Sequence, residues 1–394
     1  MQKYVIEQQM QIYIYGVGRV GRLMENLLVE KGFSVTAFID VNAASRHYKN
    51  YEIIKPDELI EVARRNAVII VALAGKYNAQ MAKETLVTFG YKNVIVYSDK
   101  RLQEQLCLMD EKITCAHCVF AAVCQLDKAE DVSKIHMVDL TISLTTKCAL
   151  NCKNCVALVP ELKEKRVVRT LKPADFEEAL KVLGEYVDTI NEYALAGGEP
   201  LLNKEIGRII DVIKKSAINF KRIRIITSAT VPIPEEFMEW LKDRRIIVTI
   251  DDYGDKTGER ARRIIQNNIE NLEKNECNYE ILNNSDGIWY DFGNFEDRKL
   301  SEAEITERFE KCNMKDCIVL SPVCYMGRCG RHMTRVSMLG GISEDGKREY
   351  IDLLNDGEMV KSELIEMMEG KMLRACNYCN GNSVEHMVNA GEQV

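Results

Sequence analysis

The chain has 394 residues, of which 46% are hydrophobic and 29% are charged. A chain of this size and composition can bury more than one core, so we expect two or three globular domains. The 53 Lys and Arg residues against 60 Asp and Glu residues give a formal charge of −7, which argues against nucleic acid as the main partner. No apolar run approaches the ~20 residues that span a bilayer and no signal region is evident, so we expect no membrane span and a cytoplasmic location.

Residues 1–100 alternate short apolar runs with helical stretches. This alternation predicts a parallel sheet covered by helices, as in a Rossmann-like domain. The expected strands are 11–15, 34–39, 67–73 and 93–97.

A glycine-rich turn follows the first of these strands. Gly16, Gly18 and Gly21 lie between this strand and a helix, which is the context that a dinucleotide-binding fingerprint requires. Asp40 ends the next strand about twenty residues further on, where an acidic group would meet ribose hydroxyls. The stretch resembles nucleotide-binding folds attached to enzymes of bacterial sugar and polysaccharide biosynthesis, so a nucleotide-sugar is as attractive a ligand as NAD. The alternative is that the glycines serve only close packing of strand and helix.

A polar connector over 101–136 separates this domain from the rest of the chain. It carries four cysteines, Cys107, Cys115, Cys118 and Cys124. Several thiols within so short a loop could bind a further iron–sulfur cluster or a zinc ion. They could equally be small apolar side chains that pack the connector against its neighbours.

The alternation of strands and helices resumes over 137–300. Such a pattern resembles part of a β/α barrel, in which chemistry takes place at the carboxyl ends of the strands. The expected strands are 138–144, 193–195, 222–226, 246–250 and 279–282. The expected helices are 172–184, 204–216, 234–242 and 256–275.

Three cysteines follow the first of the barrel strands. Cys148, Cys152 and Cys155 have C-x3-C-x2-C spacing, and cysteines clustered in a cytoplasmic chain are better explained as metal ligands than as disulfides. Three thiolates can hold three irons of a 4Fe–4S cube and leave the fourth iron open for another ligand. A structural zinc ion would need a fourth protein ligand, and no His or Cys follows closely.

With these cysteines, the chain resembles the radical S-adenosylmethionine (radical SAM) superfamily over about 137–300. A second match is Gly197-Gly198-Glu199-Pro200, similar to the motif that holds the methionine amino group of S-adenosylmethionine (AdoMet) in that family. Thr227, Ser228 and Asp251 match by position more than by motif, and Ser228-Ala229 departs from the Asn-Gly that the family often has. The resemblance implies a partial (β/α)6 barrel, reductive cleavage of AdoMet to a 5′-deoxyadenosyl radical, and a flavodoxin- or ferredoxin-type electron donor.

A second group of cysteines lies in a short, partly periodic region over 301–394, which we expect to form a small cap. This group consists of Cys312, Cys317, Cys324, Cys329, Cys376 and Cys379. The region resembles the SPASM and twitch extensions of radical SAM enzymes, which carry auxiliary 4Fe–4S clusters. The preferred ligands are Cys317, Cys329, Cys376 and Cys379. Cys312 or Cys324 could substitute, because the spacing between Gly327 and Cys329 departs from the family pattern, and a zinc ribbon or buried free cysteines are the alternatives.

Three further residues are candidates for contact with the substrate. Tyr253 and Trp289 provide aromatic faces that stack on sugars or bases, and Asp291 could bind hydroxyls or move a proton. Packing in the seam between barrel and cap is the alternative for Trp289.

Three functions fit these patterns. The first is a radical enzyme that dehydrogenates, epimerises or eliminates from a carbohydrate or nucleotide-linked sugar. The second is a radical enzyme that modifies a ribosomally made peptide. The third is a redox sensor that binds NAD and a cluster without turnover, although the glycine-glycine-glutamate-proline motif argues against it.

Overall fold

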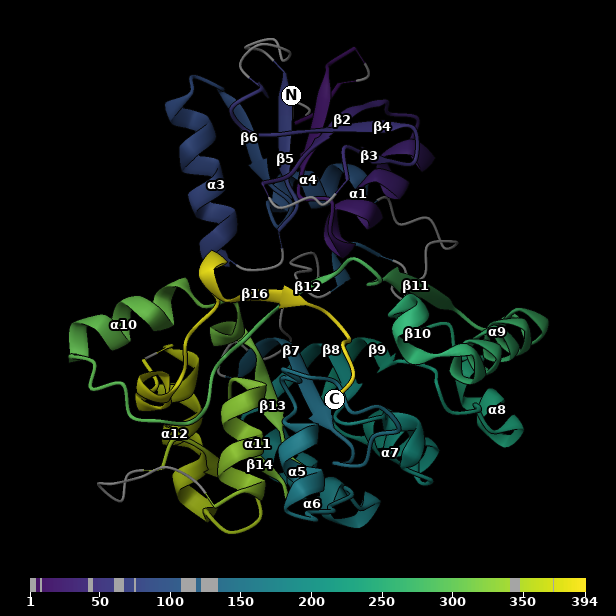
Figure 1. Cartoon of the computed structure of the whole chain (residues 1–394), viewed down its shortest axis with the longest axis vertical. Helices are drawn as coiled ribbons and strands as arrows, with labels where there is room; N and C mark the ends of the chain where they lie inside the picture. The colour runs from purple at the N-terminus through teal and green to yellow at the C-terminus, as the bar shows by residue number, and fades with distance from the viewer. Residues whose placement is uncertain are drawn as a thin grey trace. The chain divides into compact units, whose positions relative to one another are not determined.

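The computed structural model describes residues 5–7, 9–41, 45–59, 67–73, 76–107, 118–121, 134–340, 348–370 and 372–394. The chain divides into two compact units, Met1–Lys128 and Ala129–Val394. Figure 1 colours both units by residue number. Cys115 and Cys124 lie outside the described residues.

The Met1–Lys128 unit contains a six-stranded sheet with the order β3-β4-β2-β1-β5-β6. All neighbouring strands are parallel except β3 and β4. The strands are β1 Ile12–Tyr15, β2 Val35–Ile39, β3 His47–Tyr48, β4 Tyr51–Ile54, β5 Val68–Val71 and β6 Asn93–Val96. The four strands expected here are confirmed as β1, β2, β5 and β6, whereas β3 and β4 were not anticipated from the sequence.

Helices cover both faces of this sheet. Alternate residues of a strand point to opposite faces, so Ile14 and Tyr13 on β1 belong to two separate cores. Ile14 packs in one core with Leu28 of α1 (Arg19–Glu30) and with α4 (Lys100–Leu106). Tyr13 packs in the other with Leu86 of α3 (Lys76–Thr88). The result is a three-layered α/β unit.

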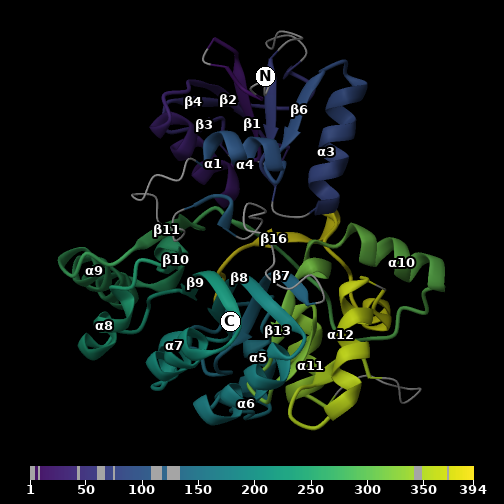
Figure 2. The same ribbon diagram turned by 180° about the vertical axis from the view of Figure 1, so that it is seen from behind.

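The Ala129–Val394 unit is built on an eight-stranded sheet with the order β11-β10-β9-β8-β7-β13-β14-β15 (Figure 2). The first five strands are β7 Ile135–Ser143, β8 Val187–Ala196, β9 Asn219–Thr227, β10 Ile246–Asp252 and β11 Tyr279–Asn283. The other three are β13 Ile318–Leu320, β14 Tyr325–Arg328 and β15 Ile351–Asp352. Strands β7 to β11 are parallel and confirm the five expected strands.

The sixth parallel strand does not come from the expected barrel segment. It is β13, which pairs with β7 from within the segment 301–394 and continues into antiparallel β14 and β15. The segments expected to form a barrel and a cap therefore share one open sheet. A second, two-stranded sheet pairs β12 (Ile288–Tyr290) with β16 (Met387–Asn389).

Five helices contribute to the core on one face of the eight-stranded sheet: α6 Pro173–Gly184, α7 Ile206–Lys215, α8 Met238–Leu241, α9 Glu259–Lys274 and α12 Val360–Met368. The other described helices of this unit are α5 Val159–Glu164, α10 Glu302–Lys311 and α11 Gly330–Met338, and α11 packs against Val319 and Gly327 on the opposite face. The helices expected around 172–184, 204–216, 234–242 and 256–275 are confirmed as α6 to α9. Helix α6 illustrates the three-to-four spacing of apolar residues, since its residues Phe176, Leu180 and Leu183 lie on one face and are buried in the core.

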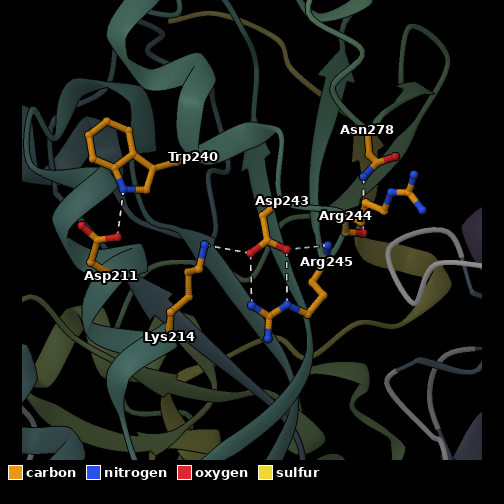
Figure 3. Close-up of polar contacts among 7 residues, drawn as sticks. All are labelled: Asp211, Lys214, Trp240, Asp243, Arg244, Arg245 and Asn278. Atoms are coloured by element: carbon orange, nitrogen blue, oxygen red, sulfur yellow. Dashed lines mark hydrogen bonds and ion pairs between the residues drawn. The ribbon is translucent and has the colours of Figure 1, made fainter.

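A polar network joins α7, α8 and β10 (Figure 3). The Asp243 carboxylate accepts from Lys214 Nζ at 2.8 Å and from Arg245 Nη2 at 3.1 Å. Burial opposes ionisation of Asp243, but the hydrogen bonds from Arg245 and Lys214 outweigh it and lower the pKa of this carboxyl. Trp240 Nε1 donates to Asp211 at 3.0 Å. Gly207 lies so close to Trp240 that an added Cβ would approach the indole ring to 2.7 Å.

Candidate active site

The central sheet of the Ala129–Val394 unit has one apolar face and one charged face. Leu140 and Ile142 on β7 point into the hydrophobic core, whereas Asp139 on the same strand lies on the opposite face. The strand register places Asp139 beside Glu192 on β8, and Glu192 beside Arg222 on β9. A row of charged groups therefore crosses three strands on the face away from the core.

Glu192 is the centre of an ion-pair network on this face. It accepts hydrogen bonds from Arg222 Nε at 2.7 Å and from Arg224 Nε at 2.7 Å. Its own side chain is 3% exposed, while Arg224 retains 20%. Asp139 and Glu280 lie close enough to influence the charge of Arg224. The charged face thus holds more carboxylates than guanidinium groups among these five residues.

The loop after β7 carries Cys148, Cys152 and Cys155. It starts from an anchor in which the Thr145 hydroxyl donates to the Arg169 carbonyl at 3.1 Å. Cys152 is buried and the other two thiols are half-buried. Burial, reinforced by a nearby carboxylate and the other two thiols, raises the pKa of Cys148 to about 12. One loop therefore gathers the three thiols at the carboxyl end of a parallel strand.

The glycine pair after β8 lies directly against this loop. Gly198 N donates to Thr145 O at 2.8 Å, and Glu199 N donates to Lys147 O at 2.7 Å. Gly197 has a φ of +126°, a conformation that favours glycine. A Cβ added to Gly198 would lie 2.2 Å from Lys147 O. The two strand-end loops can approach this closely because both positions lack a side chain.

The Glu199 carboxylate is held by the end of β9. It accepts from the Thr227 hydroxyl at 2.5 Å and from the Ser228 hydroxyl at 2.7 Å. Burial raises the pKa of Glu199, while these hydrogen bonds act in the opposite direction. Pro200 begins the short 3-10 turn that follows. Ala229 adopts a φ of +51°, so the backbone takes a left-handed conformation where the related motif often has glycine.

The end of β10 places Asp251 and Tyr253 near the same region. Burial raises the pKa of Asp251 to about 6. The ring of Tyr253 meets that of Trp289 edge-to-face, with centroids 5.6 Å apart. Asp291 instead turns back on its own backbone, because its carboxylate accepts from Gly293 N at 2.8 Å. The structure thus brings Tyr253 and Trp289 together, while Asp291 stabilises a local turn.

A segment that the sequence did not single out lies along the cysteine loop. Lys153 N donates to Glu392 O at 2.6 Å. Asn151 N donates to the Gln393 side-chain oxygen at 2.8 Å. The amide nitrogen of Gln393 lies 3.2 Å from Cys152 Sγ. No spacing rule marks Gln393, because a single amide side chain carries no sequence pattern.

The second group of cysteines forms a pocket of its own. The cysteines that line it are Cys312, Cys329, Cys376 and Cys379. Met314 N donates to Cys312 Sγ at 3.4 Å, and Gly381 N donates to Cys379 Sγ at 3.3 Å. Such backbone donors are a common means of stabilising cluster thiolates. Cys329 adopts a left-handed φ of +66°, a strained conformation of a kind that is concentrated at functional sites.

Cys317 and Cys324 lie outside this pocket. Cys317 Sγ is 3.9 Å from the Thr141 hydroxyl on β7. Cys324 is fully buried, with Sγ 3.6 Å from the Asp175 carbonyl. In this geometry Cys312, rather than Cys317 or Cys324, completes a group of four.

Guanidinium groups line the same pocket. Arg308, Arg331 and Arg335 all contribute to its wall. Arg331 and Arg335 lie over the Phe295 ring, at 4.4 and 4.1 Å from its centroid. Burial lowers the pKa of both of these guanidinium groups. A negatively charged group in the pocket would compensate these buried cations.

In the other unit, the glycine-rich turn is held by Asp40. Val17 N donates to the Asp40 carboxylate at 2.9 Å. Gly16 has a φ of +105°. A Cβ on Gly21 would lie 1.8 Å from Gly16 O, whereas the Gly18 position is open. Gly21 therefore serves close packing, and Gly18 leaves space beside the turn.

Two connector cysteines lie within the described residues. Cys107 and Cys118 are half-buried and pack against the apolar core that contains α1 and α4. Within the described ranges, no three His, Cys, Asp or Glu side chains approach closely enough to hold a single metal ion. In a 4Fe–4S cube, by contrast, each thiolate binds a separate iron.

None of the described helices has the length and apolar character that a bilayer crossing requires.

Comparison with known proteins finds a family match in the middle of the chain. The Radical SAM superfamily model matches residues 142–282. The probable GTP 3′,8-cyclase of Methanococcus aeolicus is 28% identical over 171 residues, which are 40% of this chain and 55% of that protein. The chain thus spans about half the length of this curated relative.

Solved structures are similar at low sequence identity. BtrN in complex with AdoMet and 2-DOIA gives a TM-score of 0.38 and 16% identity, over 67% of this chain and 100% of that one. Streptococcus suis SuiB bound to precursor peptide SuiA gives 0.33 and 12%, over 76% and 83%. Native anSMEcpe with bound AdoMet gives 0.31 and 18%, over 36% and 43%. At these values the similarity carries no argument about function.

Proposed function

We propose that this chain, an enzyme with a radical SAM domain over 142–282, cleaves AdoMet reductively at a 4Fe–4S cluster held by Cys148, Cys152 and Cys155. The observation that carries the proposal is the contact between the cysteine loop and Gly198-Glu199 at adjacent strand ends. When bound, such a cluster supplies the electron that breaks the sulfonium bond, and the 5′-deoxyadenosyl radical released removes a substrate hydrogen.

The protein's own residues bind and orient in this proposal. Gly197 and Gly198 keep the strand-end loops close together, because a side chain at either position would collide with the backbone that leads into the cysteine loop. Glu199, held in place by Thr227 and Ser228, sets the position of the backbone beside the thiols. Asp251 would accept from ribose or substrate hydroxyls. A flavodoxin- or ferredoxin-type protein would supply electrons.

A small polar substrate, such as a carbohydrate or a nucleotide-linked sugar, suits the charged face of the sheet. Carboxylates of Asp139, Asp251 and Glu280 can accept hydrogen bonds from several hydroxyls. The aromatic pair Tyr253 and Trp289 offers an apolar surface of the kind on which sugar rings stack. Dehydrogenation, epimerisation and elimination all begin with removal of one hydrogen. A peptide substrate remains the second candidate.

We also propose an auxiliary 4Fe–4S cluster on Cys312, Cys329, Cys376 and Cys379. A cube with four thiolates is a net anion, and the guanidinium groups of Arg308, Arg331 and Arg335 would balance its charge. Four cysteines could also hold zinc, in which case their sulfur atoms would have to move to about 2.3 Å from one ion.

The Met1–Lys128 unit would bind a nucleotide in a Rossmann-like manner. The chain places β2 and β4 on one side of β1 and then crosses over to place β5 and β6 on the other side. Open α/β sheets bind ligands at such a switch point, which here lies between β1 and β5. NAD and a nucleotide-sugar both fit this proposal. Mass spectrometry of nucleotide released from the purified protein would separate them. Cys107 and Cys118 pack against the apolar core of this unit, and a further cluster or zinc ion on them together with Cys115 and Cys124 remains the alternative.

Anaerobic reconstitution with iron and sulfide tests the main proposal. The reduced protein should release 5′-deoxyadenosine from AdoMet and hold about eight irons per chain, four for each cluster. Cys152→Ala should abolish 5′-deoxyadenosine and leave about four irons. Cys277→Ala, at a buried thiol outside both groups, is the matched control and should change neither. Turnover by Cys152→Ala would refute the proposal.

A further inference from the structure

The segment 387–394, here called the C-terminal strap, joins three parts of its unit. It begins as β16, which pairs with β12. The Ala390 carbonyl then accepts from Lys256 Nζ at 2.7 Å. Gly391 lies against Tyr253 so closely that an added Cβ would be 2.5 Å from the ring. The strap therefore reaches the cysteine loop by a fixed path.

The strap then pairs with the backbone of the cysteine loop. Lys153 N donates to Glu392 O at 2.6 Å, and Val394 N donates to Asn151 O at 2.8 Å. These two bonds flank Cys152, which is 7% exposed. The strap thus fixes the loop on both sides of one thiol.

The orientation of the Gln393 amide is determined by its partners. Its Oε1 accepts from Asn151 N at 2.8 Å, and its Nε2 donates to Gly391 O at 2.7 Å. A backbone N–H can only donate and a backbone carbonyl can only accept, so exchanging the two amide atoms would break both bonds. The atom 3.2 Å from Cys152 Sγ is therefore an N–H donor.

We propose that Gln393 is a positioning residue that raises the reduction potential of the cluster on Cys148, Cys152 and Cys155. This inference rests on the proposed function. The reduced cluster carries one more negative charge than the oxidised cluster, so a hydrogen bond to a cluster sulfur stabilises the reduced form more strongly. Loss of the N–H should make reduction harder. A carboxylate at the same place should make it harder still, because it adds a negative charge beside the thiolate.

The test compares three variants of the reconstituted full chain. Gln393→Leu removes the donor, Gln393→Glu keeps the shape but replaces the donor by a carboxylate, and Gln266→Leu on the exposed surface of α9 is the matched control. Iron content is measured first. The midpoint potential of the AdoMet-binding cluster is then measured by a redox titration followed by electron paramagnetic resonance.

The expected order of midpoint potentials is wild type and Gln266→Leu highest, Gln393→Leu lower, and Gln393→Glu lowest, with iron content retained. We expect the equilibrium between reduced and oxidised cluster to shift by roughly threefold to tenfold in Gln393→Leu, a part of what a hydrogen bond to a charged group contributes. Equal potentials in all loaded variants would overturn the inference while leaving the proposed function intact. Loss of iron from both Gln393 variants would also overturn it, since the role would then be structural. Absence of this cluster from the wild-type protein would instead refute the proposed function itself.

Discussion

The Thr227 hydroxyl donates to the Glu199 carboxylate at 2.5 Å, although Thr227 is the last residue of β9 and Glu199 follows β8. The same hydroxyl oxygen accepts from Ala229 N at 2.8 Å. One side chain therefore connects the loop after β8, which lies against the cysteine loop, to the left-handed turn after β9. A substitution of Thr227 at the end of β9 should therefore affect the position of Glu199 in the proposed AdoMet site.

Replacing Thr227 with valine should weaken AdoMet binding. The substitution keeps the volume but leaves the buried Glu199 carboxylate short of a donor, which costs about 1–3 kcal/mol. We expect AdoMet affinity to fall by roughly tenfold, measured by calorimetry on the reconstituted protein. Thr85→Val, on an exposed position of α3, should leave the affinity unchanged. If Thr227→Val binds AdoMet as tightly as the wild type does, the hydrogen bond from Thr227 to Glu199 has no role in AdoMet binding.

Gly198→Ala should disrupt the contact between the loops after β7 and β8. The new methyl group would lie 2.2 Å from Lys147 O, so the two backbones must separate. Overpacking of this kind costs about 1–3 kcal/mol, and cleavage of AdoMet should fall further than stability does. The unfolding midpoint and the yield of 5′-deoxyadenosine should be measured together. Gly184→Ala is the matched control, because neither glycine has a left-handed φ and a methyl group at Gly184 would come no closer than 3.5 Å to its neighbour Ile218.

Substitution of individual cysteines should separate ligands of the second cluster from packing residues. Cys312→Ser should lower the iron content from about eight to about four atoms per chain, since a cube that loses a thiolate is poorly held. Cys324→Ser should retain the iron, because its thiol faces the Asp175 carbonyl. Iron and sulfide assays on both variants provide the measurement. Iron loss from Cys324→Ser and not from Cys312→Ser would reverse the assignment.

Most of the parallel strands could be predicted, because β1, β2, β5 and β6 are nearly continuous apolar runs and β7 to β11 keep apolar residues on the face toward the core. Strands β3, β13 and β15 were missed because each has only two or three residues, and β13 in addition pairs with β7, which is distant in the sequence. The assignment of the sixth parallel strand failed for the same reason, since no local signal shows that Val319 pairs with Thr141.

The cysteine loop and the glycine pair could be found from spacing, because each performs its task within a few consecutive residues. The choice between Cys312 and Cys317 as a cluster ligand could not be made from spacing, because both precede Cys329. Only the fold shows that Cys317 turns toward Thr141. Gln393 was beyond prediction, since its contact with Cys152 spans most of the unit.

Asp251 should make the stability of the apo-protein depend on pH in a defined direction. Burial raises its pKa to about 6 in the folded chain, above the value of about 3.9 in an unfolded chain. Between these two values the folded protein binds the proton that the unfolded chain has released, so stability should fall as the pH rises from about 4 to about 6. Asp251→Asn removes this titration. The unfolding free energy of the wild type, relative to that of the variant, should therefore decrease by roughly 2 kcal/mol over this range and stay constant above it. Urea unfolding of both proteins at several pH values measures the difference, and parallel curves for the two proteins would contradict the assignment of the raised pKa to Asp251.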